Sequence, residues 1–225
     1  MINDQLNPLV VIDIAIFTVQ DQQLKILLVK RANEPEKGKW ALPGGILIPS
    51  KDLNLESSAR RILKTKVSVD IAYLEEVCTF SGLHRDPRGW SIATLHYALL
   101  PTDKTHALVK ESIEDLTWQN VLTCPALAFD HELQLQTALT TLRRKVSSHL
   151  LPLHLMRPKF TLSDLQKTCE AILDQKLDKS VFRRRLKNNT DIIELEEYEG
   201  GAQRPAQLFK ARANFEFKAP TIERD

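Results

Sequence analysis

Apolar residues in the first 100 positions are grouped in short runs of the kind that form β-strands. Residues 9–17 and 24–30 are rich in β-branched side chains, and a polar Asp-Gln-Gln segment separates them. This pattern predicts two strands joined by a short turn. Residues 71–80 and 92–100 have the same character and flank a polar stretch that contains glycine and proline. They predict two further strands joined by a loop.

Two longer segments repeat apolar residues at helical spacing. Residues 53–67 carry them at positions 55, 59, 62, 63 and 67, which lie on one face of a helix. Residues 130–146 predict a second long helix with Asp130 as its N-cap. The inner side of this second helix is expected to carry Leu133, Thr137, Leu142 and Val146. Strands followed by helices in this order predict an α/β sandwich.

A domain boundary is expected where this periodicity stops. Residues 147–158 have no helical or strand pattern and contain Pro152 and Pro158. A chain of 225 residues is also longer than one typical domain. The prediction is a first domain over residues 1–150 and a second over residues 155–225.

The second domain has the element order of a winged helix-turn-helix. Ser163 and Gln166 form a capping-box pattern that opens a first helix. Residues 178–187 predict a second, short helix. Residues 192–197 and 207–212 are strand-like and flank a Glu-Gly-Gly-Ala turn, which predicts a hairpin. Two helices and then a hairpin indicate a winged helix.

Composition places the chain among ordinary globular proteins, with 43% hydrophobic and 27% charged residues. Cys78, Cys124 and Cys169 are odd in number and widely spaced, so neither a disulfide framework nor a zinc site is expected. The start of the chain has no signal-peptide pattern, and the longest apolar run is too short to span a bilayer. We expect a cytoplasmic protein that does not bind a membrane.

Positive charge in the second domain is concentrated on its second helix. At 100° per residue, Arg183 and Lys187 share a face with Ser180 and Arg184. The simplest alternative is a solvated charge run, but a basic second helix in this motif is suited to the major groove of DNA. The hairpin adds further cations that could clamp the flanking backbone. The expected DNA contacts are Lys179, Ser180, Arg183, Arg184, Lys187, Arg204 and Lys210.

The first domain resembles a Nudix domain. The segment from Trp40 to Gly45 reads W-A-L-P-G-G and leads into the helix of residues 53–67. In Nudix enzymes this loop is followed by a helix of the form R-E-x-x-E-E-x-G, whose glutamates hold magnesium on a pyrophosphate. Here the interval from Gly45 to Arg61 is two residues longer than that motif allows.

The glutamates of the motif are missing in either alignment of the helix. If Arg61 is the motif's arginine, their positions hold Ile62, Thr65 and Lys66. If Arg60 is, they hold Arg61, Lys64 and Thr65. Residues 57–69 contain no carboxylate and four cations, which repel magnesium and tolerate phosphate. We expect no catalytic residue and no metal ligand, and therefore no enzyme.

The Nudix resemblance also implies a set of ligand contacts. Arg31, at the end of the second strand, matches an arginine that forks onto phosphate oxygens in many members, although a strand-end surface cation is the alternative. The segment Arg-Asp-Pro-Arg-Gly at 85–89 resembles a loop that closes over the ligand in the ADP-ribose-processing branch. The implied contacts are Arg31, Trp40, Gly44, Gly45, Arg85 and Arg88.

Taken over residues 9–215, the chain resembles the NrtR family, the Nudix-related transcriptional regulators of NAD metabolism. Residues 160–166, 177–185 and 204–209 carry the likeness in the second domain. The resemblance implies a repressor that requires no cofactor. Its first domain would bind ADP-ribose as effector, and its second would bind operators of NAD-biosynthesis genes, double-stranded inverted repeats, as a homodimer. ADP-ribose would release the DNA.

Two alternatives stay open from the sequence. One is a hydrolase of ADP-ribose or a related nucleoside diphosphate derivative that uses carboxylates outside the motif. Those carboxylates are Asp52, Glu56, Glu111, Glu114 and Asp115. The other is a DNA-binding protein whose first domain only dimerises and binds no ligand. A hydrolysis assay with magnesium distinguishes the first alternative, and a thermal shift with ADP-ribose distinguishes the second.

Overall fold

The computed structural model describes residues 7–68, 71, 73–105, 113–148, 150–187, 189–200 and 205–212. Within them, the larger sheet has seven strands. These are β1 (Leu9–Gln20), β2 (Gln23–Arg31), β3 (Trp40–Ala41), β4 (Gly44–Ile46), β5 (Tyr73–Gly82), β6 (Ser91–Leu99) and β7 (Ile113–Asn120). In this part of the chain no helix is both long and apolar enough to cross a membrane.

The sheet is mixed and is built around β1. Its main path runs β3-β2-β1-β6-β5, while β4 pairs with β1 and β7 pairs with β2. β1 and β6 are parallel, and the other pairs are antiparallel. Asp21 and Gln22 have positive φ angles of 52° and 59°, the backbone of a two-residue hairpin turn. The four predicted strands are therefore present, and β3, β4 and β7 add to them.

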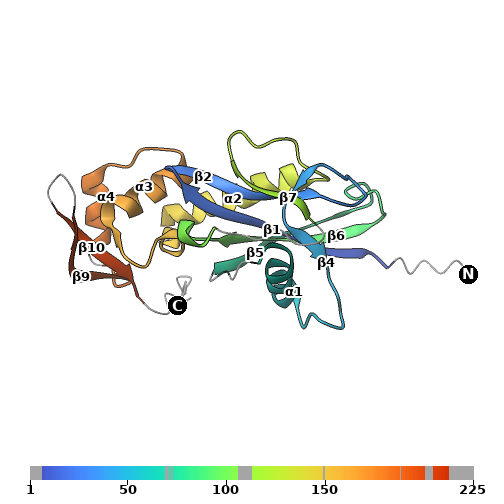
Figure 1. Cartoon of the computed structure of the whole chain (residues 1–225), viewed down its shortest axis with the longest axis horizontal. Helices are drawn as coiled ribbons and strands as arrows, with labels where there is room; N and C mark the ends of the chain where they lie inside the picture. The colour runs from blue at the N-terminus through green and yellow to red at the C-terminus, as the bar shows by residue number, and fades with distance from the viewer. Residues whose placement is uncertain are drawn as a thin grey trace, which may run out of the picture.

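Helices cover the two faces of this sheet (Figure 1). Alternate side chains of β1 point to opposite faces. Ile12, Ile14 and Ile16 pack with α1 (Leu55–Ile62) and the π-helical segment Leu63–Val67 that continues it. On the other face, Phe17 packs with α2 (His131–Ser148). The predicted α/β sandwich is confirmed.

The helix ends and faces differ in detail from the sequence pattern. Asn54 caps α1 in a capping box with Ser57. On α2 the buried face consists of Leu135, Ala138, Leu142 and Val146. The prediction for Leu133 is wrong, because its side chain is 59% exposed, and Thr137 is only half-buried. The inner face is rotated because the polar Gln134 is buried there.

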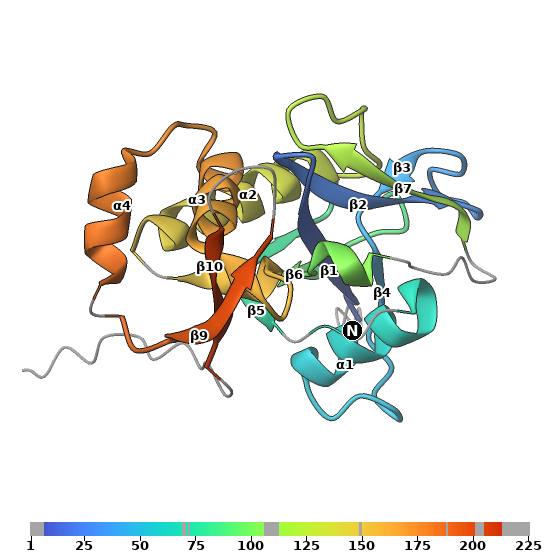
Figure 2. The same ribbon diagram turned by 60° about the vertical axis from the view of Figure 1, so that its left-hand side comes forward.

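The chain continues into a smaller region of helices and strands at one end of the molecule (Figure 2). A 3-10 helix over Leu151–Leu155 connects the two parts, and its leucines are buried in both cores. Three strands form the antiparallel sheet β8-β10-β9. The elements are β8 (Phe160–Thr161), α3 (Leu162–Leu173), α4 (Lys179–Leu186), β9 (Ile192–Glu199) and β10 (Ala206–Ala211).

Thr161, not the predicted Ser163, caps α3. The Thr161 Oγ1 atom accepts a hydrogen bond from the Asp164 amide at 3.1 Å, and the Asp164 carboxylate accepts one from the Thr161 amide at 3.0 Å. This reciprocal pair starts the helix two residues earlier. On α4, Phe182 is buried and Leu186 packs beside it, which leaves the basic residues outside.

Candidate functional site

A cavity of about 370 Å³ opens beside β1 and the end of β2. The loop around β4, the end of α1, the loop after β5 and the start of α2 complete its walls. The acidic side chains in the lining are Asp13, Glu34 and Asp86. The cationic ones are Lys30, Arg31, Arg61, Lys66, Arg85 and Arg88. Cations outnumber acids, so the cavity favours an anionic ligand.

Arg31 is held at the mouth of the cavity. Its Nε atom donates to the Pro35 carbonyl at 2.8 Å, and its Nη2 atom donates to the Asn33 carbonyl at 3.4 Å. The guanidinium carbon lies 4.7 Å from the centre of the Phe129 ring, within cation–π range. Burial and the nearby Arg88 lower the pKa of Arg31. These contacts hold the guanidinium in place. Because none of them comes from a carboxylate, they do not neutralise its positive charge.

Lys66 projects into the same cavity from the π-helical segment. Its Nζ atom donates to the Gly44 carbonyl at 2.6 Å. Burial lowers the pKa of Lys66, and the neighbouring Arg31 lowers it further, while Asp13 acts in the opposite direction. Lys66 was not among the expected ligand contacts. The indication in the sequence is its place at one of the motif's glutamate positions.

The two glycines of the loop are required for close packing. A Cβ atom on Gly44 would lie 2.3 Å from the Asp13 Oδ1 atom and 2.9 Å from the Ile12 carbonyl oxygen. A Cβ atom on Gly45 would lie 3.1 Å from the Ile62 Cγ1 atom. Both glycines line the cavity, and their lack of a side chain lets β4 pair tightly with β1 and pack on α1.

Arg85 is a buried anchor, with 8% of its side chain exposed. Its Nε and Nη2 atoms donate to the two Asp130 carboxylate oxygens at 3.0 and 2.9 Å, and its Nη1 atom donates to Ser91 at 3.1 Å. Asp130 immediately precedes α2, as predicted for a cap, but its carboxylate accepts these bonds and one from Gln134. Arg85 therefore fixes the start of α2 while it also lines the cavity, and its role as a ligand contact stays a prediction.

Arg88 and Trp40, two further predicted ligand contacts, lie in different surroundings. Arg88 lines the cavity, but Asp86 holds its guanidinium through bonds of 3.0 and 2.6 Å, and this pairing raises the pKa of Arg88. Trp40 is absent from the described cavity lining. Its indole packs on the α2 side of the sheet core, and its backbone pairs with Lys30 and Leu127.

A buried polar cluster lies behind the cavity. The Asp13 carboxylate accepts a hydrogen bond from the Gln134 Nε2 atom at 3.0 Å. The Nδ1 atom of His131 accepts one from the Leu42 amide at 2.9 Å, which leaves the proton of the neutral ring on Nε2, 3.6 Å from Asp13. Burial lowers the pKa of His131. The sequence showed this cluster only as an aspartate inside an apolar run.

The described carboxylates of the hydrolase alternative, Asp52, Glu56 and Asp115, do not line the cavity. Asp52 is held by Arg61 through bonds of 2.6 and 2.7 Å, which lowers the pKa of Asp52. Glu56 pairs with Arg60 at 2.8 Å on the surface, and Asp115 is exposed on β7. Glu111 and the side chain of Glu114 lie outside the described residues. Among the described residues, no three His, Cys, Asp or Glu side chains form a group that could hold a metal ion.

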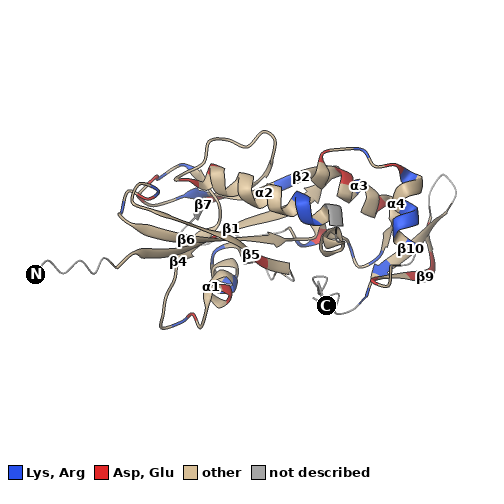
Figure 3. Cartoon of the chain, turned by 180° about the vertical axis from the view of Figure 1, so that it is seen from behind, with Lys and Arg blue, Asp and Glu red and all other residues tan. Residues whose placement is uncertain are grey.

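A second basic surface is formed by α4 (Figure 3). Its cations are exposed and line one groove with the start of α3 and with β10. Within the part of the chain that the structure describes, none of them forms an ion pair. The cations are Lys179, Arg183, Arg184 and Lys187. A protruding helix with unpaired positive charge is suited to a polyanion.

The remaining predicted DNA contacts are placed differently. The Ser180 hydroxyl donates to Asp178, the cap of α4. Lys210 is exposed on β10 next to the inward Phe209, so it points to the other face of that strand. Arg204 lies outside the described residues. β9 is acidic, although Lys159 pairs with Glu197 at 2.5 Å and reduces its charge.

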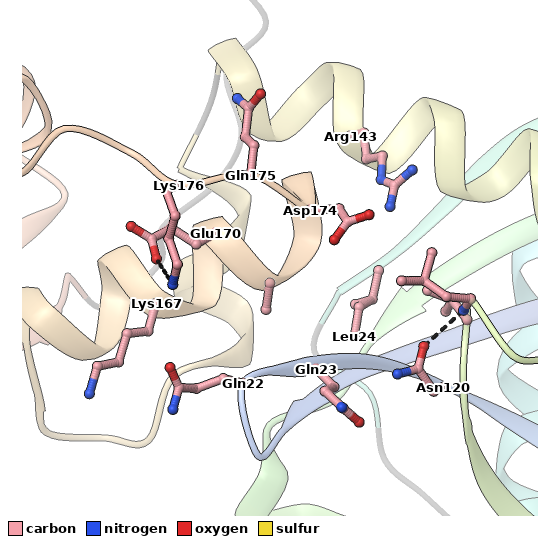
Figure 4. Close-up of a pocket in the computed structure, with 13 residues that line it drawn as sticks. Gln22, Gln23, Leu24, Asn120, Arg143, Lys167, Glu170, Asp174, Gln175 and Lys176 are labelled. Atoms are coloured by element: carbon pink, nitrogen blue, oxygen red, sulfur yellow. Dashed lines mark hydrogen bonds and ion pairs between the residues drawn. The ribbon is translucent and has the colours of Figure 1, made fainter.

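A polar cleft of about 460 Å³ lies where the two parts of the chain adjoin (Figure 4). The β1–β2 turn and the end of β7 form one wall, and α3 forms the other. The Nε atom of Arg143 on α2 donates to the Ile172 carbonyl of α3 at 2.9 Å. Glu170 on α3 pairs with Lys176 at 2.9 Å, which lowers the pKa of Glu170 to about 2. The charges of α3 around this cleft are thus largely balanced.

Comparison with protein families matches both parts of the chain. Residues 10–136 match the NUDIX domain. Residues 152–211 match the NrtR DNA-binding winged helix domain. Each match covers one of the two regions described above.

Individual relatives agree with these matches. The chain is 39% identical to the ADPR responsive transcriptional repressor NtrR of Acinetobacter baylyi, over 98% of this chain and 89% of that protein. It is also similar to the crystal structure of Shewanella oneidensis NrtR complexed with a 27mer DNA, with 34% identity and a TM-score of 0.81 over 90% of this chain and 93% of that one. The NUDIX domain of the same Shewanella protein, complexed with ADP ribose, is 38% identical with a TM-score of 0.57, over 61% of this chain and 90% of that one.

Proposed function

Because the chain belongs to the NrtR family, with a Nudix domain followed by that family's winged helix, we propose that it is a transcriptional repressor whose operator DNA is released by ADP-ribose. The observation that carries this proposal is the pair of unneutralised cationic sites in one chain. One is the cavity in the Nudix domain, and the other is the exposed helix α4.

The Nudix cavity would bind the diphosphate of ADP-ribose. Arg31 supplies a fixed guanidinium whose fork matches phosphate oxygens, and Gly44 and Gly45 bring backbone against the same space. Arg88 is the next contact, since its side chain is 40% exposed and can rotate from Asp86 onto a phosphate. Arg85 supports the site from behind by fixing the start of α2.

The winged helix would bind operator DNA through α4. The cations that line the groove beside α4 would contact phosphates and guanine edges of the DNA. They are Lys179, Arg183, Arg184 and Lys187. A protomer carries one such helix, so a specific operator is read by a two-fold homodimer. The target is then an inverted repeat whose half-sites are separated by whole helical turns. Arg204, which lies outside the described residues, would contact the flanking backbone. The genes controlled are those of NAD biosynthesis, as the family resemblance implies.

The same cavity is not expected to hydrolyse ADP-ribose. A Nudix-type reaction needs a divalent ion to activate water, and the motif positions here carry no carboxylate. The cations that line the cavity do not fit such an ion. One relative, an ADP-ribose pyrophosphatase of Methanocaldococcus jannaschii, is 30% identical over 53% of this chain, which makes residual hydrolysis the alternative to be measured.

Release of DNA requires that the two ligands favour different arrangements of the dimer. Each ligand then weakens the other by the same factor. The test is gel retardation on the protein's own upstream region, with and without ADP-ribose. The proposal expects a shifted band that ADP-ribose removes. A shift that ADP-ribose leaves unchanged at saturating concentration would contradict the sensor role, and the absence of any shift would contradict the repressor role on that region.

A further inference from the structure

The charges in the Nudix cavity fall into two groups. Three of its cations are neutralised by carboxylates. Their pairs are Arg61 with Asp52, Arg85 with Asp130 and Arg88 with Asp86. The other three, Lys30, Arg31 and Lys66, have no carboxylate partner among the described residues. An unpaired charge in a partly buried site is costly unless a ligand supplies the opposite charge.

Lys66 is the most deeply placed of these unpaired cations. Its ammonium donates to the Gly44 carbonyl at 2.6 Å, which fixes it against the loop that follows Pro43. An ammonium has three N–H donors, so two are left after this bond. Arg31, Arg61 and Arg88 act on it as like charges, and this repulsion is relieved when an anion enters.

The position of Lys66 in the Nudix motif gives this geometry a specific meaning. With the motif aligned on Arg61, Lys66 occupies a position that holds a metal-binding glutamate in Nudix enzymes. A glutamate there attracts a divalent cation, which then contacts the diphosphate. A lysine repels that cation and brings its own positive charge to the same place.

We propose that the Lys66 ammonium takes the place of the metal ion, so that Lys66 and Arg31 hold the diphosphate of the effector without any divalent cation. The proposal rests on the proposed binding of ADP-ribose in this cavity. It also separates binding from hydrolysis. An ammonium attracts phosphate oxygens as a metal ion does, but it neither coordinates water nor generates hydroxide. A single side chain thus retains the charge needed to sense the effector and omits the chemistry that would destroy it.

Lys64 provides a matched control. It is two positions from Lys66 on the same π-helical segment, it has the same charge, and its side chain is exposed. It does not line the cavity. If net charge alone mattered, removing the charge at either position would weaken ADP-ribose binding equally. If Lys66 contacts the diphosphate, only its replacement would weaken binding.

Calorimetry of ADP-ribose binding to the full chain tests the proposal, first with EDTA and then with magnesium. The parent protein should bind with the same affinity in both buffers. Lys66→Gln, which keeps an N–H donor and removes the charge, should weaken binding at least tenfold, and Lys64→Gln should leave it unchanged. DNA retardation by each variant shows that it is folded. If Lys66→Gln does not fold, Lys66→Met takes its place, because methionine can fill the space of the aliphatic part of the lysine side chain. This variant should also bind ADP-ribose at least tenfold more weakly.

Two results would overturn the proposal and leave the sensor role standing. One is binding by the parent protein only in the presence of magnesium. The other is an affinity of the Lys66 variant equal to that of Lys64→Gln. If the parent protein binds ADP-ribose in neither buffer, the proposed function fails at the ligand itself, and this inference fails with it.

Discussion

Arg31 and Arg60 are both arginines of the Nudix domain, but they differ in surroundings. Arg31 lines the cavity over Phe129, whereas Arg60 is on the surface of α1 and pairs with Glu56. Arg31→Ala should weaken ADP-ribose binding by about 1.5–3 kcal/mol, the value of a charge-assisted phosphate bond. Calorimetry measures this, with Arg60→Ala as the control that should bind normally. Equal affinities in the two variants would remove Arg31 from the site.

The buried His131 and the half-buried His154 both contribute to a dependence of stability on pH. Burial lowers the pKa of His131 and brings the pKa of His154 to about 4, while an unfolded histidine has a pKa of about 6.5. Below that value the unfolded chain binds more protons than the native one, so the free energy of unfolding falls as pH falls. The His154 contribution is present at pH 7 and is progressively lost towards pH 4.

His154→Phe isolates this contribution, because phenylalanine fills the place beside Tyr73 and cannot be protonated. Between pH 7 and pH 5 the parent protein should lose about 1–2 kcal/mol more stability than the variant. Urea unfolding at the two pH values measures the difference. An identical loss in both proteins would show that His154 is not held neutral in the native state.

At the level of single residues, the sequence predicted the chemistry of the cavity, but it did not identify all of the residues that form it. Arg31 and the two glycines, which were predicted as ligand contacts, line the cavity. The pairing of Arg85 with Asp130 could not be foreseen, because those residues are 45 positions apart. Lys66 and Asp13 were missed for a similar reason, since their roles arise only where β1, β4 and the π-helical segment meet.

The structural element proposed to carry DNA recognition is α4. It is capped by Asp178, whose carboxylate accepts from the Val181 amide at 2.8 Å, and anchored by the buried Phe182. Its exposed arginines make no ion pair in the described part of the chain, so their removal should affect DNA binding and not folding.

Replacing Arg183 and Arg184 together by alanine should abolish retardation of the operator, because it removes phosphate and base contacts from the recognition helix. ADP-ribose affinity and thermal stability should be unchanged. A control that replaces Lys37 and Lys51, exposed cations of the Nudix domain, should shift DNA normally. If the α4 variant shifts the operator as the parent does, α4 is only a solvated helix face.

Regular elements with a clear apolar period were predictable from the sequence. The first two strands and α4 are found close to their expected positions. β7 was not expected, because its residues are mostly polar and its place depends on pairing with β2. The segment that joins the two regions was read as irregular, but its leucines are buried in a 3-10 helix because two cores meet around it.

In the whole molecule, α2 extends from the effector cavity to the winged helix. It begins at His131 in the cavity lining, and near its other end Arg143 donates to the Ile172 carbonyl of α3. Leu142 of α2 packs in the same core as Ile172. This helix and this core thus connect the Nudix domain to α3, the helix that precedes α4.

The intact protein should not turn over ADP-ribose with magnesium at ordinary enzyme rates, because the motif's carboxylates are absent and their loss removes the activated water. A coupled assay for AMP release, with the double variant of α4 as a preparation-matched sample, measures this. Sustained magnesium-dependent turnover that persists through repeated purification would support the hydrolase alternative.

The central claim is that ADP-ribose and operator DNA bind one protein and oppose each other. The most direct measurement is calorimetry of ADP-ribose binding to the free protein and to the protein saturated with operator DNA. The account predicts weaker binding to the DNA complex, by the same factor by which saturating ADP-ribose weakens operator binding. Equal ADP-ribose affinity for the free and the DNA-bound protein would contradict it.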